Sequence, residues 1–372
     1  MKAREPVDAL VVGGGVVGMA IAYGLVRSGA SVEVIDEGDD AFRAARGNFG
    51  LVWVQGKGAA CPDYARWSRE SARLWPEFAR RLSADSGVEL ELSQRGGLML
   101  CLNEPELAQR VQLLESIAAA ADTPYPFEVW DSNTLHERVP AIGERVLGAT
   151  YTPMDGHVSP LRLLRALVEA FRGLGGCLRS GLSVRDIRRL GEVFHVDTGG
   201  PPHLARRIVL AAGLGNRHLA PLVGLEAPVR PNRGQVMVTE RMAPFLELPT
   251  GQLRQTGEGS VQIGDSLEEV GFDDRTTTRE LARIAERALL CFPRLREVNV
   301  VRSWGALRVM TPDGMPIYQA STRCPGAFVA TCHSGITLAA HHAGAIADCV
   351  RGGPVPRELT SFQAERFHVQ AS

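Results

Sequence analysis

The chain has 372 residues, a hydrophobic content of 45% and a formal net charge of -1 at pH 7. This length supports two lobes with a large core, and a charge so near zero gives no field that would attract nucleic acid or an anionic membrane. The seven cysteines are odd in number and no two have C-x-x-C spacing, which argues against a disulfide framework or a metal site. We therefore expect reduced thiols in a cytoplasmic protein that binds no metal and no nucleic acid.

The first informative stretch is DALVVGGGVVGMAIAYGL, residues 8–25, which permits two interpretations. Residues 9–26 carry no charge, as in a targeting or membrane-spanning segment, but a spanning helix needs about 20 apolar residues. Three consecutive glycines interrupt such a helix near its start, each at a cost of roughly 1 kcal/mol relative to Ala, and no small-residue cleavage site is evident. We expect no integral membrane segment.

The second interpretation is a nucleotide-binding turn. Residues 9–12 are a short apolar run typical of a buried parallel strand, and Gly13, Gly15 and Gly18 follow at G-x-G-x-x-G spacing. The first glycine permits the tight turn, the second lets the backbone approach a pyrophosphate, and the third lets the helix pack on the strand. This spacing predicts a strand, a turn and a helix that bind a dinucleotide.

The next strand supports this prediction. SVEVIDEG, residues 31–38, ends at Asp36 and Glu37, where a carboxylate can accept hydrogen bonds from ribose hydroxyls and disfavours a 2′-phosphate. Val16 and Val17 lie within the glycine motif, and the N-terminus of the following helix would offer unpaired N–H groups to the phosphates. We count all four residues among the dinucleotide contacts.

Further along, residues 43–58 (RAARGNFGLVWVQGKG) are predicted to form an irregular loop, followed by a helix over 62–87. Residues 88–114 predict two strands around Gly96 and Gly97 and then a helix, which begin a second lobe.

The chain then returns to the first lobe, with a helix capped by Ser159, a strand pair, and an apolar strand within 206–216. Residues 225–325 predict a mainly β region with one amphipathic helix over 278–292. Residues 326–350 predict a strand, a glycine-containing turn and a long helix.

Four segments, in this order, resemble the D-amino-acid-oxidase-like family of FAD enzymes, which includes glycine oxidase and sarcosine oxidase. They are GGGVVG (13–18) with Asp36, IVLAAG (208–213), GALRVMTPDGMPIY (305–318) and TCHSGITLAA (331–340). A nicotinamide-dependent dehydrogenase would need only the first β-α-β signature. The resemblance covers essentially the whole chain.

The resemblance implies an α/β fold, with a Rossmann-like FAD-binding domain and an interleaved, mainly antiparallel β substrate domain. On this basis the FAD-binding domain would comprise residues 1–85, 151–224 and 325–372, and the substrate domain residues 86–150 and 225–324.

Within the family, NFGLVWVQGKG (48–58) and CHSGITLAA (332–340) are most similar to the β subunits of bacterial opine oxidases. Multi-subunit proline and hydroxyproline dehydrogenases are the close alternative. This similarity implies oxidative cleavage of octopine or nopaline to arginine and a 2-oxo acid. It also implies a partner α subunit, a small iron–sulfur subunit, an FMN at a subunit interface, and electron transfer to a partner or a respiratory acceptor, with peripheral association with the inner membrane as an option. A D-amino-acid or glycine oxidase acting alone and a non-catalytic flavin relay subunit remain alternatives.

The family position of Arg308 implies a two-point clamp on the substrate carboxylate, a geometry that Lys cannot reproduce. Arg233 is a weaker candidate, for which a structural ion pair is equally expected. Gln55 and Lys57 are placed within reach of the substrate or the flavin N5, and His333 is a catalytic candidate in the last turn.

The remaining candidates are cofactor contacts. The turn before the last helix would face the flavin N1/C2 edge, where N–H groups and a helix N-terminus favour the anionic reduced ring, although Thr337 could instead cap that helix. No cysteine lies in residues 305–308, where some relatives attach FAD, so we expect noncovalent FAD. The candidates are Arg46, Asn48, Phe49 and Gly50 beside the isoalloxazine, Val184 at the adenine, Ala212 and Gly213 beside the cofactor, and Ser334, Gly335, Ile336 and Thr337 in the turn.

Overall fold

A computed structural model describes residues 5–38, 44–45 and 47–368. Its largest element is an eight-stranded sheet with the order β16-β17-β11-β1-β2-β8, to which β10 and β9 are attached through β11. The strands from β17 to β8 are parallel, and β16 and the β9–β10 hairpin are antiparallel to their neighbours. The bounds are β1 Val7–Val12, β2 Val32–Asp36, β8 Cys177–Ser180, β9 Asp186–Leu190, β10 Val193–Asp197, β11 His203–Leu210, β16 Ile317–Ala320 and β17 Ala327–Thr331.

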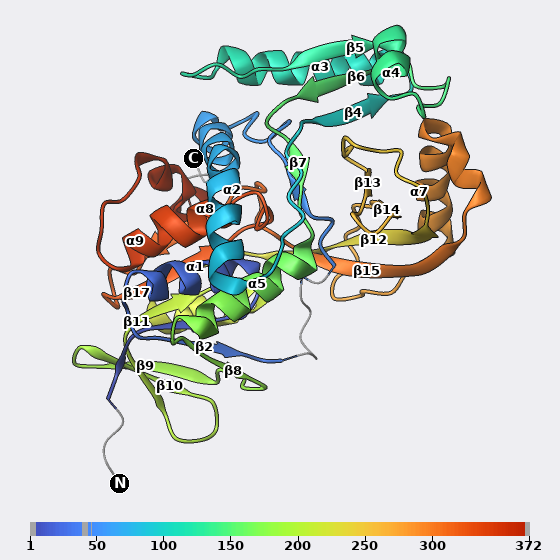
Figure 1. Cartoon of the computed structure of the whole chain (residues 1–372). Helices are drawn as coiled ribbons and strands as arrows, with labels where there is room; N and C mark the ends of the chain where they lie inside the picture. Colours follow the sequence, from blue (N-terminus) through green and yellow to red (C-terminus); the bar gives the residue numbers. More distant parts are fainter. Residues whose placement is uncertain (1–4, 39–43, 46, 369–372) are drawn as a thin grey trace.

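Three long helices lie together on one face of this sheet, as Figure 1 shows: α1 (Val16–Arg27), α2 (Pro62–Ser86) and α5 (Pro160–Gly173). A final helical run packs against α1 and consists of α8 (Ala339–His341), a π-helical segment (His342–Ile346) and α9 (Ala347–Val350). A Cβ at Gly24 of α1 would lie 2.2 Å from the carbonyl oxygen of Ala343, so these two helices meet backbone to backbone. The main hydrophobic core fills the space between these helices and the sheet.

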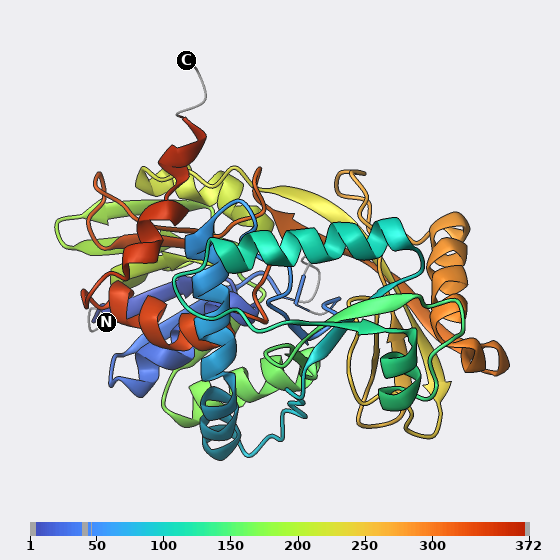
Figure 2. The same cartoon turned by 90° about the horizontal axis from the view of Figure 1, so that it is seen from above.

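The second lobe contains a four-stranded antiparallel sheet with the order β13-β14-β12-β15 and a three-stranded antiparallel sheet with the order β4-β6-β5. Figures 1 and 2 show α3 beside the three-stranded sheet and α7 against the four-stranded one. This lobe has its own core, which includes Trp130 and Phe292. The bounds are β4 Gly97–Cys101, α3 Glu104–Ala119, β5 Glu128–Asp131, α4 Ser132–Arg138, β6 Gly148–Thr152, β12 Arg230–Arg241, β13 Leu253–Gln255, β14 Ser260–Ile263, α7 Thr278–Cys291 and β15 Val300–Met310.

Short elements complete the chain. A two-stranded ladder joins β3 (Leu51–Val52) to β7 (Gly156–His157) between the lobes. The remaining helical turns are η1 Gly213–Gly215, α6 Asn216–Leu219, η2 Ala220–Val223, η3 Pro293–Glu297, η5 Arg357–Phe362 and η6 Ala364–Phe367. In the part of the chain that the structure describes, no helix combines the length and the apolar character needed to cross a bilayer.

The observed layers confirm the predicted fold class, an α/β nucleotide-binding lobe with an interleaved, mainly antiparallel second lobe. Two details differ from expectation. The strand predicted before Gly96 is absent from residues 88–95, because Glu91 has φ 57°, which an extended strand cannot include, and only Ser93 forms a bridge, with His157. In addition, β16 pairs with β17 in the large sheet, whereas the expected domain division at 324/325 assigns β16 to the substrate domain.

Candidate active site

The glycine turn after β1 has the geometry that its spacing predicts. Gly13 has φ 110°, and a Cβ there would lie 2.4 Å from the carbonyl oxygen of Ala211 in the neighbouring chain segment. A Cβ on Gly18 would lie 2.0 Å from the carbonyl oxygen of Gly13, whereas one on Gly15 would meet no atom within 4 Å. The first and third glycines therefore permit the fold, and the second leaves the backbone open toward a ligand.

A cavity of about 500 Å³ begins at this turn. Asp36 lies at its wall, where its carboxylate accepts hydrogen bonds from the backbone N–H groups of Gly14 (2.7 Å) and Gly38 (2.9 Å). Twelve predicted cofactor contacts line the cavity: Gly13, Gly15, Val16, Val17, Asp36, Glu37, Asn48, Val184, Ala212, Gly213, Gly335 and Ile336. His218, Leu219 and Phe272 line it too and were not predicted.

A second cavity of about 350 Å³ lies beside the first, toward the β lobe. The two share a wall made by Ala44, Asn48, Val309, Cys332, His333 and Ile336, so together they form one elongated space. We call this second part the substrate cavity. Its apolar lining includes Phe49, Leu51, Trp53 and Met99, and its polar lining includes Gln55, Lys57, Arg110, Asp265, Arg308, Ser334 and Thr337.

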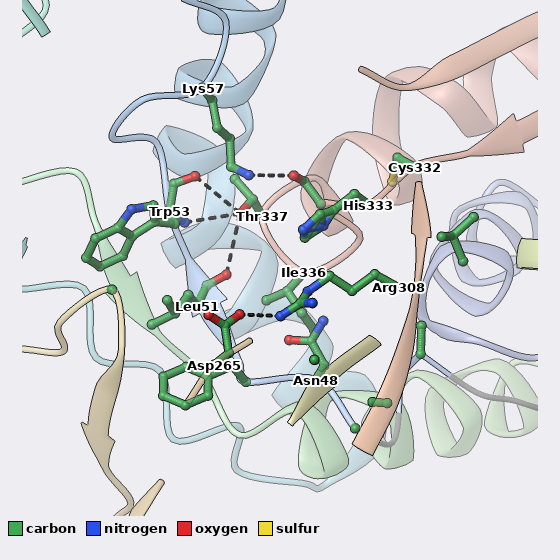
Figure 3. Close-up of a pocket in the computed structure, with 18 of the residues that line it drawn as sticks. Asn48, Leu51, Trp53, Lys57, Asp265, Arg308, Cys332, His333, Ile336 and Thr337 are labelled. Atoms are coloured by element: carbon green, nitrogen blue, oxygen red, sulfur yellow. Dashed lines mark hydrogen bonds and ion pairs between the residues drawn. The ribbon is translucent and has the colours of Figure 1, made fainter. Parts of the chain in front are cut away.

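The last turn, residues 332–337, separates β17 from the final helical run and lies where the two cavities meet. Figure 3 labels Cys332, His333, Ile336 and Thr337 of this turn. Thr337 does not cap the helix, which begins at Ala339 without a side-chain cap. Instead the Thr337 hydroxyl accepts a 3.1 Å hydrogen bond from the backbone N–H of Trp53, and the indole of Trp75 donates to the Thr337 carbonyl oxygen at 3.1 Å. These hydrogen bonds hold the turn against the loop of residues 43–58 and against α2.

Lys57 extends from that loop to the same turn. Its ammonium donates to the hydroxyl of Ser334 (Figure 3). The Ser334 hydroxyl lies 2.8 Å from the hydroxyl of Tyr64. Burial lowers the pKa of Lys57 to about 8, against smaller opposing effects of Cys332 and Asp155. Lys57 is therefore a half-buried cation at the substrate cavity.

His333 lies between Lys57 and Arg308 in Figure 3, and its ring is open to the cavity. Enclosure by the cavity walls, and then the positive charges of Lys57 and Arg308, lower the pKa of His333 to about 3. At neutral pH the imidazole is uncharged, so it can accept or donate a hydrogen bond but is a weak base.

Arg308 is placed by β15, where it lies opposite Asn232 of β12. Its guanidinium forms an ion pair with Asp265 and donates to the side-chain oxygen of Asn232 at 3.0 Å and to the carbonyl oxygen of Ser266 at 2.8 Å. The side chain lines the substrate cavity, as its family position implies. Sequence reasoning missed Asp265, which is 43 residues away in the chain and belongs to no motif.

Three other predicted residues do not contribute a free side chain to the described site. Gln55 lines the substrate cavity, but its amide is held by Gly97 (3.0 Å), Asp155 (2.8 Å) and Thr150 (2.7 Å), so it supports the loop. Gly50 lines neither cavity: it has φ 89°, and a Cβ there would lie 2.3 Å from the carbonyl oxygen of Val158. Arg46 lies outside the described residues.

Arg233 forms ion pairs with Glu268 (2.7 Å) and Asp273 (3.2 Å), the structural alternative considered for it. His341 stacks on Trp67, and His342 contacts the hydroxyl of Tyr318 at 2.7 Å, so both are packing residues.

The described geometry fits FAD. The Cα of Gly15 is bare toward the cavity, the helix α1 begins at that point, and Asp36 closes β2 beside it. The space continues from there, past Val17 and Gly335, to the wall shared with the substrate cavity. A cavity that runs from the glycine turn to the last turn suits an extended dinucleotide, whose reactive ring would lie at the last turn.

Comparisons with known proteins agree with this geometry. The model of the DAO family, described as FAD dependent oxidoreductase, matches residues 8–349. The B subunit of opine oxidase from Agrobacterium tumefaciens (strain Ach5) is 45% identical over 365 residues, which cover 98% of each chain, and its namesake from Rhizobium meliloti is 44% identical with the same coverage. The crystal structure of glycine oxidase from Geobacillus kaustophilus matches with a TM-score of 0.89 at 26% identity and covers 97% of this chain and 98% of that one.

These matches confirm the resemblance drawn from the four sequence segments and identify the cofactor as FAD. The chain belongs to the DAO family and is an FAD-dependent oxidoreductase.

Proposed function

We propose that the protein oxidises the C–N bond of an N-substituted amino acid, specifically an opine such as octopine or nopaline. The observation that carries this proposal is the substrate cavity, which opens onto the wall of the FAD cavity and contains the guanidinium of Arg308. The near-full-length identity of 45% to a protein named as the B subunit of opine oxidase supports the choice of substrate class.

When bound, the flavin supplies the redox chemistry, because it accepts a hydride from the carbon beside the substrate nitrogen. The chain binds and orients the substrate. Arg308 and Lys57 supply positive charge for a carboxylate, and neutral His333 offers a hydrogen bond between them. The apolar side chains of Trp53, Leu51 and Phe49 keep water from the reacting carbon. Water then adds to the imine product and cleaves it to arginine and a 2-oxo acid.

The proposal includes a multi-subunit assembly. Relatives at 44–45% identity are named as one of the subunits of an oxidase, which supports a partner α subunit for this chain. We include in the proposal a small iron–sulfur subunit and an FMN at a subunit interface, which would pass electrons to a respiratory acceptor. We also propose noncovalent FAD, because residues 305–308, Gly-Ala-Leu-Arg, offer no thiol where some family members attach it.

The test is anaerobic mixing of the purified holoenzyme, alone and with its partner subunit, with octopine, nopaline, D-alanine, glycine and L-proline. Flavin absorbance is followed first, and oxygen is then admitted. We expect bleaching by an opine that persists in air until an artificial electron acceptor is added. Bleaching by D-alanine or glycine with rapid reoxidation and peroxide formation would instead show a stand-alone oxidase.

Two further outcomes would contradict the proposal. Bleaching by L-proline alone would place the chain with the proline and hydroxyproline dehydrogenases. Failure of every amine to bleach the flavin, with the partner present, would indicate a non-catalytic flavin relay subunit.

A further inference from the structure

Arg110 is a cation of the substrate cavity that the chemistry above does not use. It extends from α3, in the β lobe, whereas Arg308 extends from β15. Its guanidinium is close to the loop that carries Gln55 and Lys57: a Cβ on Gly56 would lie 2.8 Å from its Nη1 atom. Gly56 has φ 81° and no side chain, which lets Arg110 lie directly against the loop backbone.

Arg110 forms two long hydrogen bonds, both to uncharged acceptors. Its Nη2 is 3.4 Å from the amide oxygen of Gln55 and its Nε is 3.4 Å from the hydroxyl of Thr150. Among the described residues Arg110 forms no ion pair, although it is largely enclosed and burial lowers its pKa. Arg308, in contrast, already has a carboxylate partner in Asp265.

Asp155, a carboxyl group whose charge acts on Arg110, does little to compensate it. Asp155 is fully buried, and its two oxygens accept hydrogen bonds from the backbone N–H of Val54 (2.6 Å) and the amide of Gln55 (2.8 Å). Burial also raises the pKa of Asp155 to about 7, so its negative charge is incomplete at neutral pH. An enclosed guanidinium without a full counter-charge is costly, and an anionic ligand relieves that cost.

The position of Arg110 fits such a ligand. Arg110 lies at the part of the loop that contains Gln55 and Gly56, and the next residue, Lys57, contacts Ser334. His333 lies between Lys57 and Arg308 (Figure 3). Two guanidinium groups from different elements therefore line one cavity.

We propose that Arg110 binds the second carboxylate of the substrate, on the other side of the secondary amine from the carboxylate that Arg308 binds. This inference rests on the proposed function, in which an opine carries a carboxylate on each side of its secondary amine, and it adds the residue that recognises the second carboxylate. Arg110 sets specificity, because an amine with one carboxylate leaves its guanidinium without a partner.

The test uses two inert ligands that the flavin cannot oxidise. Diglycolate has two carboxylates and an ether oxygen in place of the nitrogen, and methoxyacetate has one carboxylate. Their Kd values are measured from the change in flavin absorbance of the holoenzyme. We expect the native protein to bind diglycolate at least about 30-fold more tightly than methoxyacetate, and Arg110→Gln to reduce that preference to below about 3-fold. Arg110→Lys should retain part of it.

Gln109→Ala, at the exposed neighbour on α3, is the matched control and should keep the full preference. The melting temperature and flavin spectrum of each variant report folding, and if Arg110→Gln fails to fold, Arg110→Lys decides alone. An unchanged preference in a folded Arg110 variant, or no preference in the native protein, would overturn the inference. Reduction of the flavin by octopine in the same preparation separates the two proposals. If octopine reduces the flavin and the Arg110 variant keeps the native preference for diglycolate, only the role of Arg110 is contradicted. If no amine reduces the flavin but the Arg110 variant loses that preference, only the opine reaction is contradicted.

Discussion

Arg308 and Asp265 form an ion pair at the wall of the substrate cavity, so a substrate carboxylate must compete with Asp265 for the same guanidinium. We expect Asp265→Asn to lower the Kd for diglycolate by about 5- to 10-fold, because it removes the competing negative charge and leaves Arg308 in place. The measurement is a titration of the holoenzyme by flavin absorbance. Asp274→Asn removes the same charge from an exposed position and lines neither cavity, so it should leave the Kd unchanged. Weaker binding in Asp265→Asn would mean that Asp265 itself contacts the ligand.

Arg308→Ala should raise the KM for the oxidised substrate by roughly 30-fold or more, which corresponds to about 2 kcal/mol of lost carboxylate binding. FAD should stay bound, because Arg308 lines the substrate cavity and not the cavity that begins at the glycine turn. Steady-state kinetics with an artificial acceptor and the flavin-to-protein absorbance ratio measure the two effects. Arg308→Lys should recover only part of the loss, since an ammonium cannot form the two parallel hydrogen bonds. Native substrate kinetics in Arg308→Ala would exclude Arg308 as the clamp.

The glycine turn makes a prediction that separates folding from cofactor binding. Gly15→Ala should leave the fold intact, because its Cβ would meet no protein atom within 4 Å and its backbone is in an ordinary extended conformation. The added methyl projects toward the ligand, so we expect FAD to be bound at least about 10-fold more weakly. Gly13→Ala should instead lower the melting temperature, because its Cβ would clash with the Ala211 carbonyl oxygen at 2.4 Å. FAD retention on gel filtration and thermal unfolding measure the two effects, and an FAD-replete Gly15→Ala protein would contradict the assignment.

The lowered pKa of Lys57 predicts a pH dependence of anion binding. With a pKa of about 8, Lys57 is an ammonium below that value and a neutral amine above it. Diglycolate is fully ionised throughout this range, so its Kd should rise by up to about 10-fold between about pH 7 and pH 9.5 as the cavity loses one positive charge. Lys57→Met should bind more weakly at neutral pH and show a shallower profile. The remaining slope would come from Asp155, because burial raises its pKa to about 7 and its growing negative charge opposes anion binding near Arg110. A profile that keeps its slope in Lys57→Met would assign the titration to another group.

Local signals in the sequence were sufficient to place the glycine turn and Asp36 at the wall of the first cavity. Gly13, Gly15 and Asp36 act within one β-α-β unit, where the spacing alone determines which atoms meet. Arg308 could be found because a family motif surrounds it, even though β15 brings it to the cavity from far along the chain.

The parts that sequence reasoning missed depend on long-range contacts. Arg110 lies on a surface helix among other charged residues, and only the packing of α3 over the loop at Gly56 makes it a cavity residue. Asp265 follows β14 and reaches Arg308 only through the pairing of β12 with both β14 and β15. Gln55 was expected to reach the substrate, yet Gly97, Thr150 and Asp155, all from the segment between α2 and α5, hold its amide. No pattern in a single sequence encodes such contacts.

The wall shared by the two cavities has a thermodynamic consequence. His333, Cys332 and Ile336 contact both spaces, and the turn that carries them is fastened to Trp53 and Trp75. A ligand that contacts this turn from the substrate cavity therefore also affects the surface that binds the flavin. The bound flavin, in the same way, affects the surface that binds the substrate. Linkage requires the two effects to be equal, so by whatever factor FAD tightens the binding of a dicarboxylate, the dicarboxylate tightens the binding of FAD.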